Sequence, residues 1–571
     1  MHWLFVLATI SVGAPVEEPI FLLGQNEKAE VVLPSGQVIP LELGKNPLQV
    51  LTNKNGQKLI LCGGEEKKSG EIKQGAFLGL IARDLKTYEK IIQCDSALTA
   101  YTINNDRSTI WLATQGGISK NEIINPKIYQ ISLESLVTTE VVLDSIPCEI
   151  ALSSDSKWLA VATLGKAETS ILTLFETAPL KLAATFDIVK NPGLLSFNDD
   201  STALVVAGYG SPDIVEVVDN NGKKEEKSFI IPTEHNMKLK TPTPAGVNII
   251  DLISLQSKQV ELGMVNQGLV AGADTTIYGF INGESNGSVI AASPVGLLWE
   301  KKCDFVPRFI QERPGTSQIF IIGGKKISII DKQNGNPVKD ITTDSDLMPF
   351  AFLDNSVYAY SYNMSKQKLS ILNLDNLEVG KSLAVGSKGL AAFKTVVMIA
   401  SVVQYGNSLQ PQYVNGVRIP ANVSRIYWSH APQGNMVAVL GQEKLYMLNS
   451  FLAEIYSYDM QKGIVAKKLG YLGEKTLYLQ MAPNGKYVIL VSGDKWKLVN
   501  TVTDKADLTF DPVGLKVSFA FQSVAAPTSY FSPDGEKMYI ASGSKITVID
   551  LRNGAKLAAF DSKTKDALVC W

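Results

Sequence analysis

Histidine, arginine and cysteine are scarce in this chain of 571 residues. The three histidines, His2, His235 and His430, are too few and too far apart in sequence to predict a multi-histidine copper or iron centre. Only seven arginines occur, and the net charge is −2. Neither a guanidinium cluster nor an overall positive field therefore favours nucleic acid or an anionic membrane as a partner.

The five cysteines show no metal or haem spacing, because none forms a CxxC, CxxCH or Cys/His zinc pattern. Cys62 and Cys148 lie within the apolar runs KLILCGG and SIPCEIAL. We expect them to act as small buried hydrophobic residues.

No long hydrophobic run follows the N-terminal region. The longest, TVVMIASVV at 395–403, is far shorter than the roughly 18 residues that a transmembrane helix needs. We expect no membrane span.

The first 14 residues, MHWLFVLATISVGA, are apolar and end in small residues. This pattern is typical of a secretory signal, although no Lys or Arg precedes the apolar stretch. We interpret 1–14 as a signal peptide cleaved after Gly13, which predicts a secreted or periplasmic protein. The alternative is a first buried strand in a cytoplasmic protein.

One phrase recurs along the chain, usually at intervals of about 40–50 residues, a period typical of repeat architectures. A short polar turn with Asp or Asn, often followed by Gly, precedes four to six apolar residues that end in small ones. The clearest copy is YFSPDGEKMYIASGSKITVIDLRNG at 530–554, and the turns lie near 55, 106, 155, 200, 315, 355, 434, 484 and 534.

Each copy predicts a four-stranded antiparallel meander. Asp534-Gly535 and Asn484-Gly485 can reverse the chain, because Gly tolerates positive φ and Asn or Asp bonds its own backbone. The strand that follows, such as 538–541, is apolar on both faces and must be packed on both. A second reversal is marked by an Asp and a Gly four residues apart, as in Asp550 and Gly554, Asp331 and Gly335, and Asp459 and Gly463.

About eleven such units fill the chain, and no run of 12 or more residues has sustained helical periodicity. The fold class is therefore all-β. Small sheets bury both faces by radial stacking, which is the β-propeller architecture. A solenoid or an array of β-sandwiches is the alternative.

These units resemble the WD40-like and YVTN-like blades of propeller proteins, although the Trp-Asp and Gly-His pairs of true WD40 repeats are missing. Because 11–12 blades exceed a usual ring, we expect two tandem propellers. The N-terminal propeller would span 15–295 and the C-terminal one 296–571. Leftover strands at opposite termini, such as PIFLLG and DALVCW, could close a ring by pairing.

The one string that resembles a catalytic motif is Gly283-Glu284-Ser285-Asn286-Gly287, a match to G-x-S-x-G. A nucleophile elbow needs a helix after it, whereas SVIAASPVG reads as a strand, so we interpret the string as a turn. Oxygen-rich segments at 198–201, 219–222 and 342–346 lack the EF-hand pattern. We predict no cofactor, although calcium or another divalent ion is not excluded.

The mixed-charge clusters GEEKKSGEIK (64–73) and GKKEEKS (222–228) read as solvated loops. We assign no catalytic, cofactor, metal or binding residue. Tyr209, Pro212, Tyr405 and Tyr413 are loop residues that could equally be buried or part of turns.

The leading hypothesis is a non-catalytic, protein-binding scaffold outside the cytoplasm, since propellers present rigid loop faces. The alternatives are a secreted propeller hydrolase of the lactonase or lyase type with a metal at the ring axis, and a cytoplasmic tandem-propeller assembly factor. The partner and the oligomeric state are left open.

Overall fold

In a computed structural model, the described part of the chain is built from β-strands, and no helix in that part is long and apolar enough to cross a membrane. The described residues are 19–23, 28–33, 37–42, 46–67, 70–119, 122–163, 170–189, 192–198, 200–208, 215–218, 224–227, 237–239, 245–263, 269–271, 276–282, 285–293, 296–352, 357–363, 366–385, 413–414, 417–418, 436–439, 444–449, 454–459, 464–471, 476–482, 484–492, 495–510, 528–532, 535–542, 545–561 and 568–570. The predicted signal peptide (1–14) lies outside them.

Eleven antiparallel sheets of four or more strands account for most of these residues. We number the sheets 1–11 in chain order. Sheets 1–4 contain β1 (Ile20–Leu23), β2 (Lys28–Val32), β3 (Val38–Glu42) and β54 (Leu568–Cys570); β4 (Pro47–Thr52), β5 (Lys58–Cys62), β8 (Phe77–Ile81) and β9 (Tyr88–Gln93); β10 (Leu98–Ile103), β11 (Thr109–Thr114), β14 (Lys127–Ser132) and β15 (Thr138–Val142); and β16 (Pro147–Leu152), β17 (Trp158–Thr163), β18 (Ser170–Thr177) and β19 (Leu180–Ile188).

Sheets 5–8 continue the same arrangement. They contain β20 (Pro192–Phe197), β21 (Ala203–Gly208), β25 (Ala245–Asp251) and β26 (Gln256–Gly263); β27 (Leu269–Ala271), β28 (Ile277–Asn282), β29 (Gly287–Ser293) and β30 (Gly296–Cys303); β31 (Phe309–Glu312), β32 (Gln318–Gly323), β33 (Lys326–Asp331) and β34 (Pro337–Thr342); and β35 (Ala351–Phe352), β36 (Tyr358–Asn363), β37 (Lys368–Asn373), β38 (Glu378–Val379) and β39 (Leu383–Ala384).

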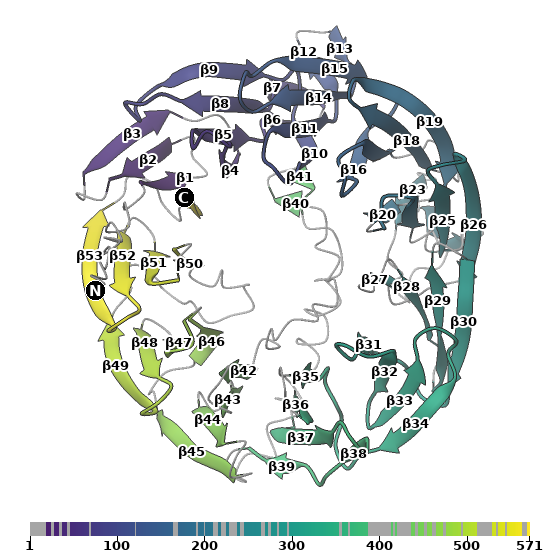
Figure 1. The fold of residues 1–571 in the computed structure, drawn as a ribbon, viewed down its shortest axis with the longest axis vertical. Coiled ribbons are helices and arrows are strands. Elements are labelled where there is room, and N and C mark those ends of the chain that lie inside the picture. The colour runs from purple at the N-terminus through teal and green to yellow at the C-terminus, as the bar shows by residue number, and fades with distance from the viewer. Residues whose placement is uncertain are drawn as a thin grey trace, which may run out of the picture.

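Sheets 9–11 complete the series. They contain β42 (Met436–Val439), β43 (Lys444–Asn449), β44 (Glu454–Asp459) and β45 (Ile464–Tyr471); β46 (Thr476–Met481), β47 (Tyr487–Ser492), β48 (Lys495–Asn500) and β49 (Lys505–Phe510); and β50 (Thr528–Phe531), β51 (Lys537–Ser542), β52 (Lys545–Asp550) and β53 (Ala555–Asp561). Two further strands, β40 (Tyr413–Val414) and β41 (Val417–Arg418), form a hairpin inside the ring near β10 (Figure 1).

The sheets follow one another around a single central opening (Figure 1). Eleven clusters of buried apolar side chains each join two successive sheets, and one of them joins sheet 11 back to sheet 1. In that cluster Leu22 and Val32 pack with Tyr539, Ile546 and Val548. The described sheets therefore form one closed β-propeller.

Within the described residues, the sheets do not divide into the two expected tandem propellers, 15–295 and 296–571. Residue 295 lies outside the described residues, and Gly296 begins β30, which pairs with β29 within sheet 6. A common apolar cluster, which includes Tyr278, Trp299 and Phe305, also continues from sheet 6 into sheet 7. The same kind of packing joins every pair of neighbouring described sheets, so sheets 6 and 7 meet as any other pair does.

Strands from the two ends of the chain meet in sheet 1. The last strand, β54, pairs antiparallel with β1, so that Leu22 lies opposite Val569 and Phe21 opposite Cys570. Three N-terminal strands and one C-terminal strand thus make one sheet, in the order β3-β2-β1-β54.

The repeated turn between the first and second strands of a sheet, here called the inner turn, has the predicted backbone. Its fourth residue is left-handed in six sheets, namely at Gly56, Arg107, Ser156, Ser201, Gly485 and Gly535, whereas in sheet 7 the third residue, Gly315, is left-handed. In sheet 3 the side-chain oxygen of Asn104 accepts hydrogen bonds from the N–H groups of Ser108 and Thr109. The turns expected near 355 and 434 lie outside the described residues.

The turn between the third and fourth strands, here called the outer turn, begins with a side chain that caps it. Asp331 accepts hydrogen bonds from the N–H groups of Gln333 and Asn334, and Gly335 has a φ of 69°. The spacing of Asp331 and Gly335 is confirmed as a turn. In other sheets the left-handed place is filled by Leu136, Leu255 or Leu377, which the sequence pattern did not indicate.

Candidate functional site

Two hairpins extend the connections between the second and third strands of sheets 2 and 3. The first consists of β6 (Glu65–Glu66) and β7 (Ile72–Gln74), and the second of β12 (Gly117–Ser119) and β13 (Glu122–Ile124). A parallel bridge joins Glu71 to Ile118, and the N–H of Ile118 donates to the carbonyl of Gly70 at 2.8 Å. We call these four strands the hairpin platform.

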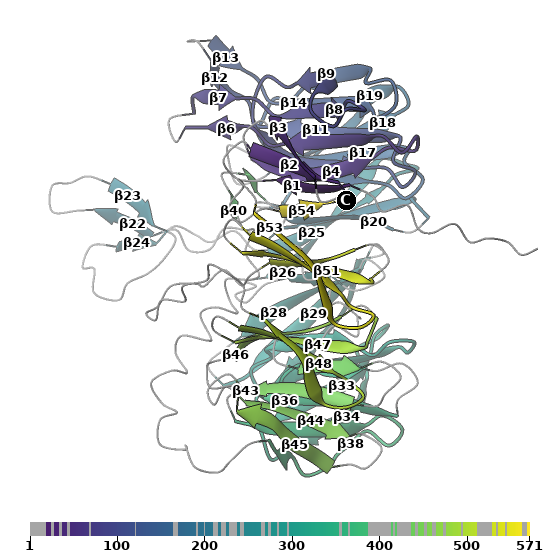
Figure 2. The same cartoon turned by 90° about the vertical axis from the view of Figure 1, so that its left-hand side faces the viewer.

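The hairpin platform projects from one side of the ring, as does the small sheet of β22 (Val215–Val218), β23 (Lys224–Lys227) and β24 (Met237–Leu239) (Figure 2). All three hairpin insertions follow the second strand of a sheet. Since successive strands run in opposite directions, connections at this point emerge on the same face of the ring.

The platform is held together by ion pairs yet exposes apolar side chains. Lys67 pairs with Glu71 at 2.7 Å, and Lys73 pairs with Glu65 at 2.5 Å. On the second hairpin, Ile123 is 82% exposed and Ile118 is 44% exposed. The charged clusters at 64–73 and 222–228 were expected to be loops; the structure instead places β6, β7 and β23 within them.

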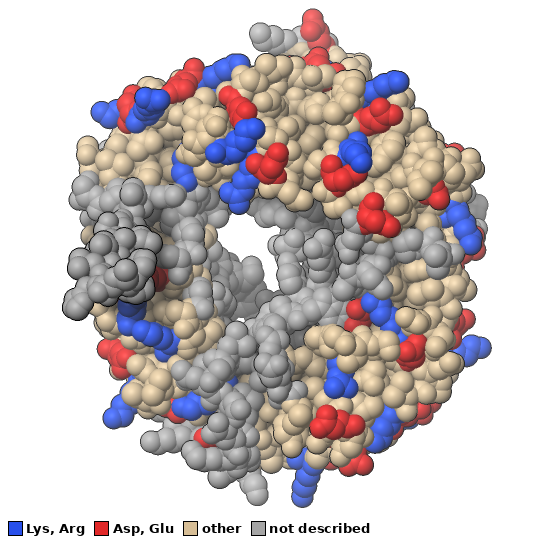
Figure 3. Space-filling model, viewed as in Figure 1, with Lys and Arg blue, Asp and Glu red and all other residues tan. Residues whose placement is uncertain are grey.

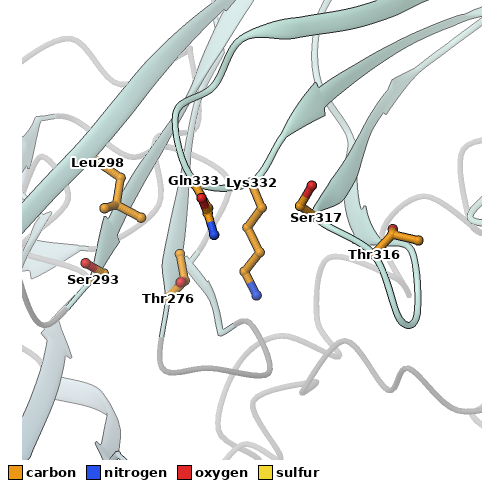
Figure 4. Close-up of a pocket in the computed structure, with 7 residues that line it drawn as sticks. All are labelled: Thr276, Ser293, Leu298, Thr316, Ser317, Lys332 and Gln333. Atoms are coloured by element: carbon orange, nitrogen blue, oxygen red, sulfur yellow. The ribbon is translucent and has the colours of Figure 1, made fainter.

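A cavity of about 380 Å³ lies between sheets 6 and 7 (Figure 4). Hydroxyl and amide side chains dominate its wall, together with one ammonium and one aliphatic side chain: Thr276, Ser293, Leu298, Thr316, Ser317, Lys332 and Gln333. Lys332 points into the space between Thr276 and Ser317 (Figure 4).

A buried charged cluster adjoins this cavity. The ammonium of Lys332 lies 2.9 Å from Oε1 of Glu312, whose side chain is 7% exposed. Tyr278 donates its hydroxyl to the same oxygen at 2.8 Å. The indole N–H of Trp299 donates to the carbonyl of Lys332 at 2.7 Å and so ties sheet 6 to the outer turn of sheet 7.

Neither the charged cluster nor the cavity was predicted, but the sequence contained a signal for the charged cluster. The outer turn of sheet 11 reads IDLRNG at 549–554, whereas that of sheet 7 reads IDKQNG at 330–335. The two strings differ at two positions, Leu551 against Lys332 and Arg552 against Gln333. The Lys in place of a buried Leu marks a local departure from the packing rule.

The structure places the G-x-S-x-G string in a hairpin. Gly283 and Glu284 lie outside the described residues, and Ser285 and Asn286 lead directly into the strand β29, which pairs with β28. The helix that a nucleophile elbow requires does not follow the motif. The interpretation of this string as a turn is confirmed.

The described cysteine side chains are buried free thiols: Cys62, Cys94, Cys148 and Cys303. Burial raises the pKa of Cys94 to about 12 and that of Cys303 to about 11. Both thiols therefore stay protonated at neutral pH and are poor nucleophiles. The predicted burial of Cys62 and Cys148 is confirmed.

Of the oxygen-rich segments, 342–346 is described, as is 198–201 except for Asp199. In 198–201 the oxygens serve the inner turn, since Asn198 accepts from the N–H groups of Thr202 and Ala203. In 342–346, Asp344 accepts from the hydroxyl of Ser382 and pairs with Lys368 at 3.4 Å. The segment 219–222 is outside the described residues, as are Tyr209, Pro212 and Tyr405. Of Tyr413, only the strand position in β40 is described.

Within the described residues no group of three or more His, Cys, Asp or Glu could hold a metal ion.

Among the described residues of the face seen in Figure 3, charges of both signs are interspersed, with no extended region of one sign. This distribution gives no electrostatic support for nucleic acid as a partner.

No family model matches the chain, and no curated protein sequence matches it. Among solved structures, it is similar to Kuenenia stuttgartiensis hydrazine synthase, with 11% identity over 66% of this chain and 100% of that one, and a TM-score of 0.28. It is also similar to a eukaryotic initiation factor (12% identity, 81% and 97% of the two chains, TM-score 0.35). A third similar structure is Citrobacter koseri AztD, with 10% identity over 81% of this chain and 96% of that one, and a TM-score of 0.29. Likenesses at this level carry no argument about function, and the assignment of a propeller rests on the strand pairing and packing described above.

Proposed function

We propose that this chain is a non-catalytic scaffold that binds a protein partner through the hairpin platform. The observation that carries the proposal is the exposure of Ile118 and Ile123 on a hairpin that projects from the ring. Large apolar side chains at a projecting strand edge are typical anchors for a protein partner.

The geometry favours an extended segment of the partner as the bound element. In the pairing of the platform, β7 neighbours β12 and β12 neighbours β13, so β13 lies at the outer edge. A partner strand could pair with the backbone of β13 while an apolar side chain covers Ile123. The rigid ring would hold the edge in place, which lowers the entropic cost of binding.

The proposal is tested by purifying the protein at native levels with its bound partners and comparing Ile123→Asp with Ile253→Asp. Both isoleucines are 82% exposed, but Ile253 lies on the outer turn of sheet 5. We expect a stoichiometric partner that Ile123→Asp weakens at least about tenfold, or about 1.4 kcal/mol, while Ile253→Asp retains it. If both variants retain the partner equally well, the hairpin platform is not the surface that binds it.

Two further parts of the proposal concern location and family. We propose that residues 1–14 act as a signal and that the protein works outside the cytoplasm, with blades of the WD40-like or YVTN-like kind. Mass spectrometry of the native N-terminus tests the location: a start at Ala14 supports it, and a start at Met1 or His2 contradicts it.

A further inference from the structure

The outer turn of sheet 7 departs from the repeat at its second residue. In seven sheets this residue donates its backbone N–H to a carbonyl near the inner turn of the same sheet. In six of the seven sheets the residue is buried and uncharged: Leu133, Thr177, Leu252, Leu374, Thr501 and Leu551. In sheet 7 the same hydrogen bond is made by Lys332, to the carbonyl of Ser317 at 2.6 Å.

The last residue before the inner turn departs in the same sheet. Its equivalents are apolar in five other sheets: Ile103, Leu152, Phe197, Met481 and Phe531. In sheet 7 the position is Glu312, and its carboxylate meets the ammonium of Lys332. Two departures from the apolar pattern thus compensate each other in charge within one sheet.

Stability of the fold does not account for this substitution. Removing a Lys and a Glu from water carries a large desolvation cost, and apolar side chains in the same places are generally at least as stabilising. The other sheets show that the repeat accommodates apolar residues there. Sheet 2 also departs, with Thr52 and an exposed Arg83 at the corresponding positions, but these two cannot form an ion pair because Thr52 is uncharged. A buried ion pair that breaks the repeat beside a cavity is characteristic of a functional position.

The charges around the cavity select against ions. Lys332 is neutralised by Glu312, and the nearby Asp331 accepts a hydrogen bond from the Ser317 hydroxyl at 2.9 Å. The two carboxylates stand behind the wall, Glu312 on Lys332 and Asp331 on Ser317, and oppose an anion from there. A cation would meet the Lys332 ammonium directly, since it is the one charged group in the wall. The hydroxyl and amide groups of the wall suit a neutral ligand that can both donate and accept hydrogen bonds.

We propose that the cavity between sheets 6 and 7 binds a neutral, hydroxyl-rich small molecule of monosaccharide size. Its volume of about 380 Å³ is at the small end of ligand pockets. Lys332 and Gln333 would bond the ligand hydroxyls, and Leu298 would contact a C–H face of the ring. This site is separate from the hairpin platform and does not depend on the proposed scaffold role.

The test is calorimetric titration of the full chain with uncharged sugars (glucose, galactose, mannose and N-acetylglucosamine) and with charged counterparts (glucuronate, glucose 6-phosphate and glucosamine). The variants are Gln333→Ala and Ser317→Ala, both exposed at the cavity rim. The control is Asp375→Ala, because Asp375 occupies the place of Gln333 in the outer turn of sheet 8. Unchanged melting temperatures show that the variants are folded.

We expect one or more of the uncharged sugars to bind at a 1:1 ratio with a Kd of about 1 mM or lower. Each rim variant should weaken binding about tenfold, and the control should not change it. The proposal is overturned if none of the uncharged sugars binds, if a charged counterpart binds more tightly, or if the rim variants bind as well as the wild type.

Discussion

Closure of the ring predicts an energetic coupling between the two ends of the chain. Leu22 in β1 is fully buried and belongs to the cluster that contains Ile546 of β52, which is 1% exposed. The preceding residue, Phe21, packs in the cluster shared with sheet 2. Adjacent residues of β1 thus bury their side chains against different neighbouring sheets.

Leu22→Ala should lower the free energy of unfolding by about 3 kcal/mol. The change removes three buried carbon atoms, which at about 0.8 kcal/mol each account for about 2.4 kcal/mol. The cavity that remains adds a further contribution, and measured Leu→Ala changes in cores fall between about 2 and 5 kcal/mol. Urea unfolding followed by tryptophan fluorescence measures this loss.

The decisive comparison is a double-mutant cycle between Leu22→Ala and Ile546→Ala. Since both side chains line the same cluster, we expect a coupling energy of at least about 0.5 kcal/mol. The matched control pairs Leu22→Ala with Leu112→Ala, a fully buried residue of the cluster between sheets 2 and 3; this pair should be additive within about 0.5 kcal/mol. Additivity of both pairs would refute the closure through sheets 1 and 11.

Two further predictions concern thiols and acid. Four thiols are buried, namely Cys62, Cys94, Cys148 and Cys303, and they should react with Ellman's reagent at pH 8 only after the protein unfolds. The reason is that burial keeps the reagent out and raises the pKa of Cys94 to about 12 and that of Cys303 to about 11. Rapid labelling of any of the four in the folded protein would contradict this prediction. Burial alone would raise the pKa of Asp155, but hydrogen bonds from Ser153 and Lys157, with a Lys157 ion pair at 3.0 Å, lower it to about 2. A lowered carboxyl pKa stabilises the fold above about pH 4, and this contribution is lost as the pH falls toward 2. Asp155→Asn should therefore lower the free energy of unfolding by about 1 kcal/mol at pH 6, after allowance for solvent screening of a side chain that is 34% exposed. At pH 2 the same substitution should lower it by almost nothing. Urea unfolding at the two pH values measures both losses, and a loss that does not change with pH would contradict the lowered pKa of Asp155.

Local chain reversals could be predicted well because they depend on a few adjacent residues. Asn484-Gly485 and Asp331…Gly335 encode their turns through side-chain caps and a left-handed residue. The run after Gly535 was also interpreted correctly, since Ile540 packs toward sheet 10 and Tyr539 toward sheet 1. Each of these features lies within about ten residues of sequence.

The number of rings could not be predicted, because every junction between sheets uses the same apolar pattern. Ile290 packs toward sheet 5 and Ala291 toward sheet 7, as at any other sheet, and nothing in such a pattern marks where a ring closes. The candidate sites were missed for a different reason. Ile123 belongs to a short polar hairpin without strand-like alternation, and the pair of Glu312 and Lys332 is a departure that only alignment of the repeats with one another makes visible.

Electron cryomicroscopy of the purified full-length chain is the most direct test of the central claim. The account predicts one closed ring in which eleven antiparallel sheets, ten of four strands and one of five, surround an open axis, with β54 paired to β1. Two smaller rings joined near residue 295, or an open stack whose first and last sheets do not touch, would contradict it.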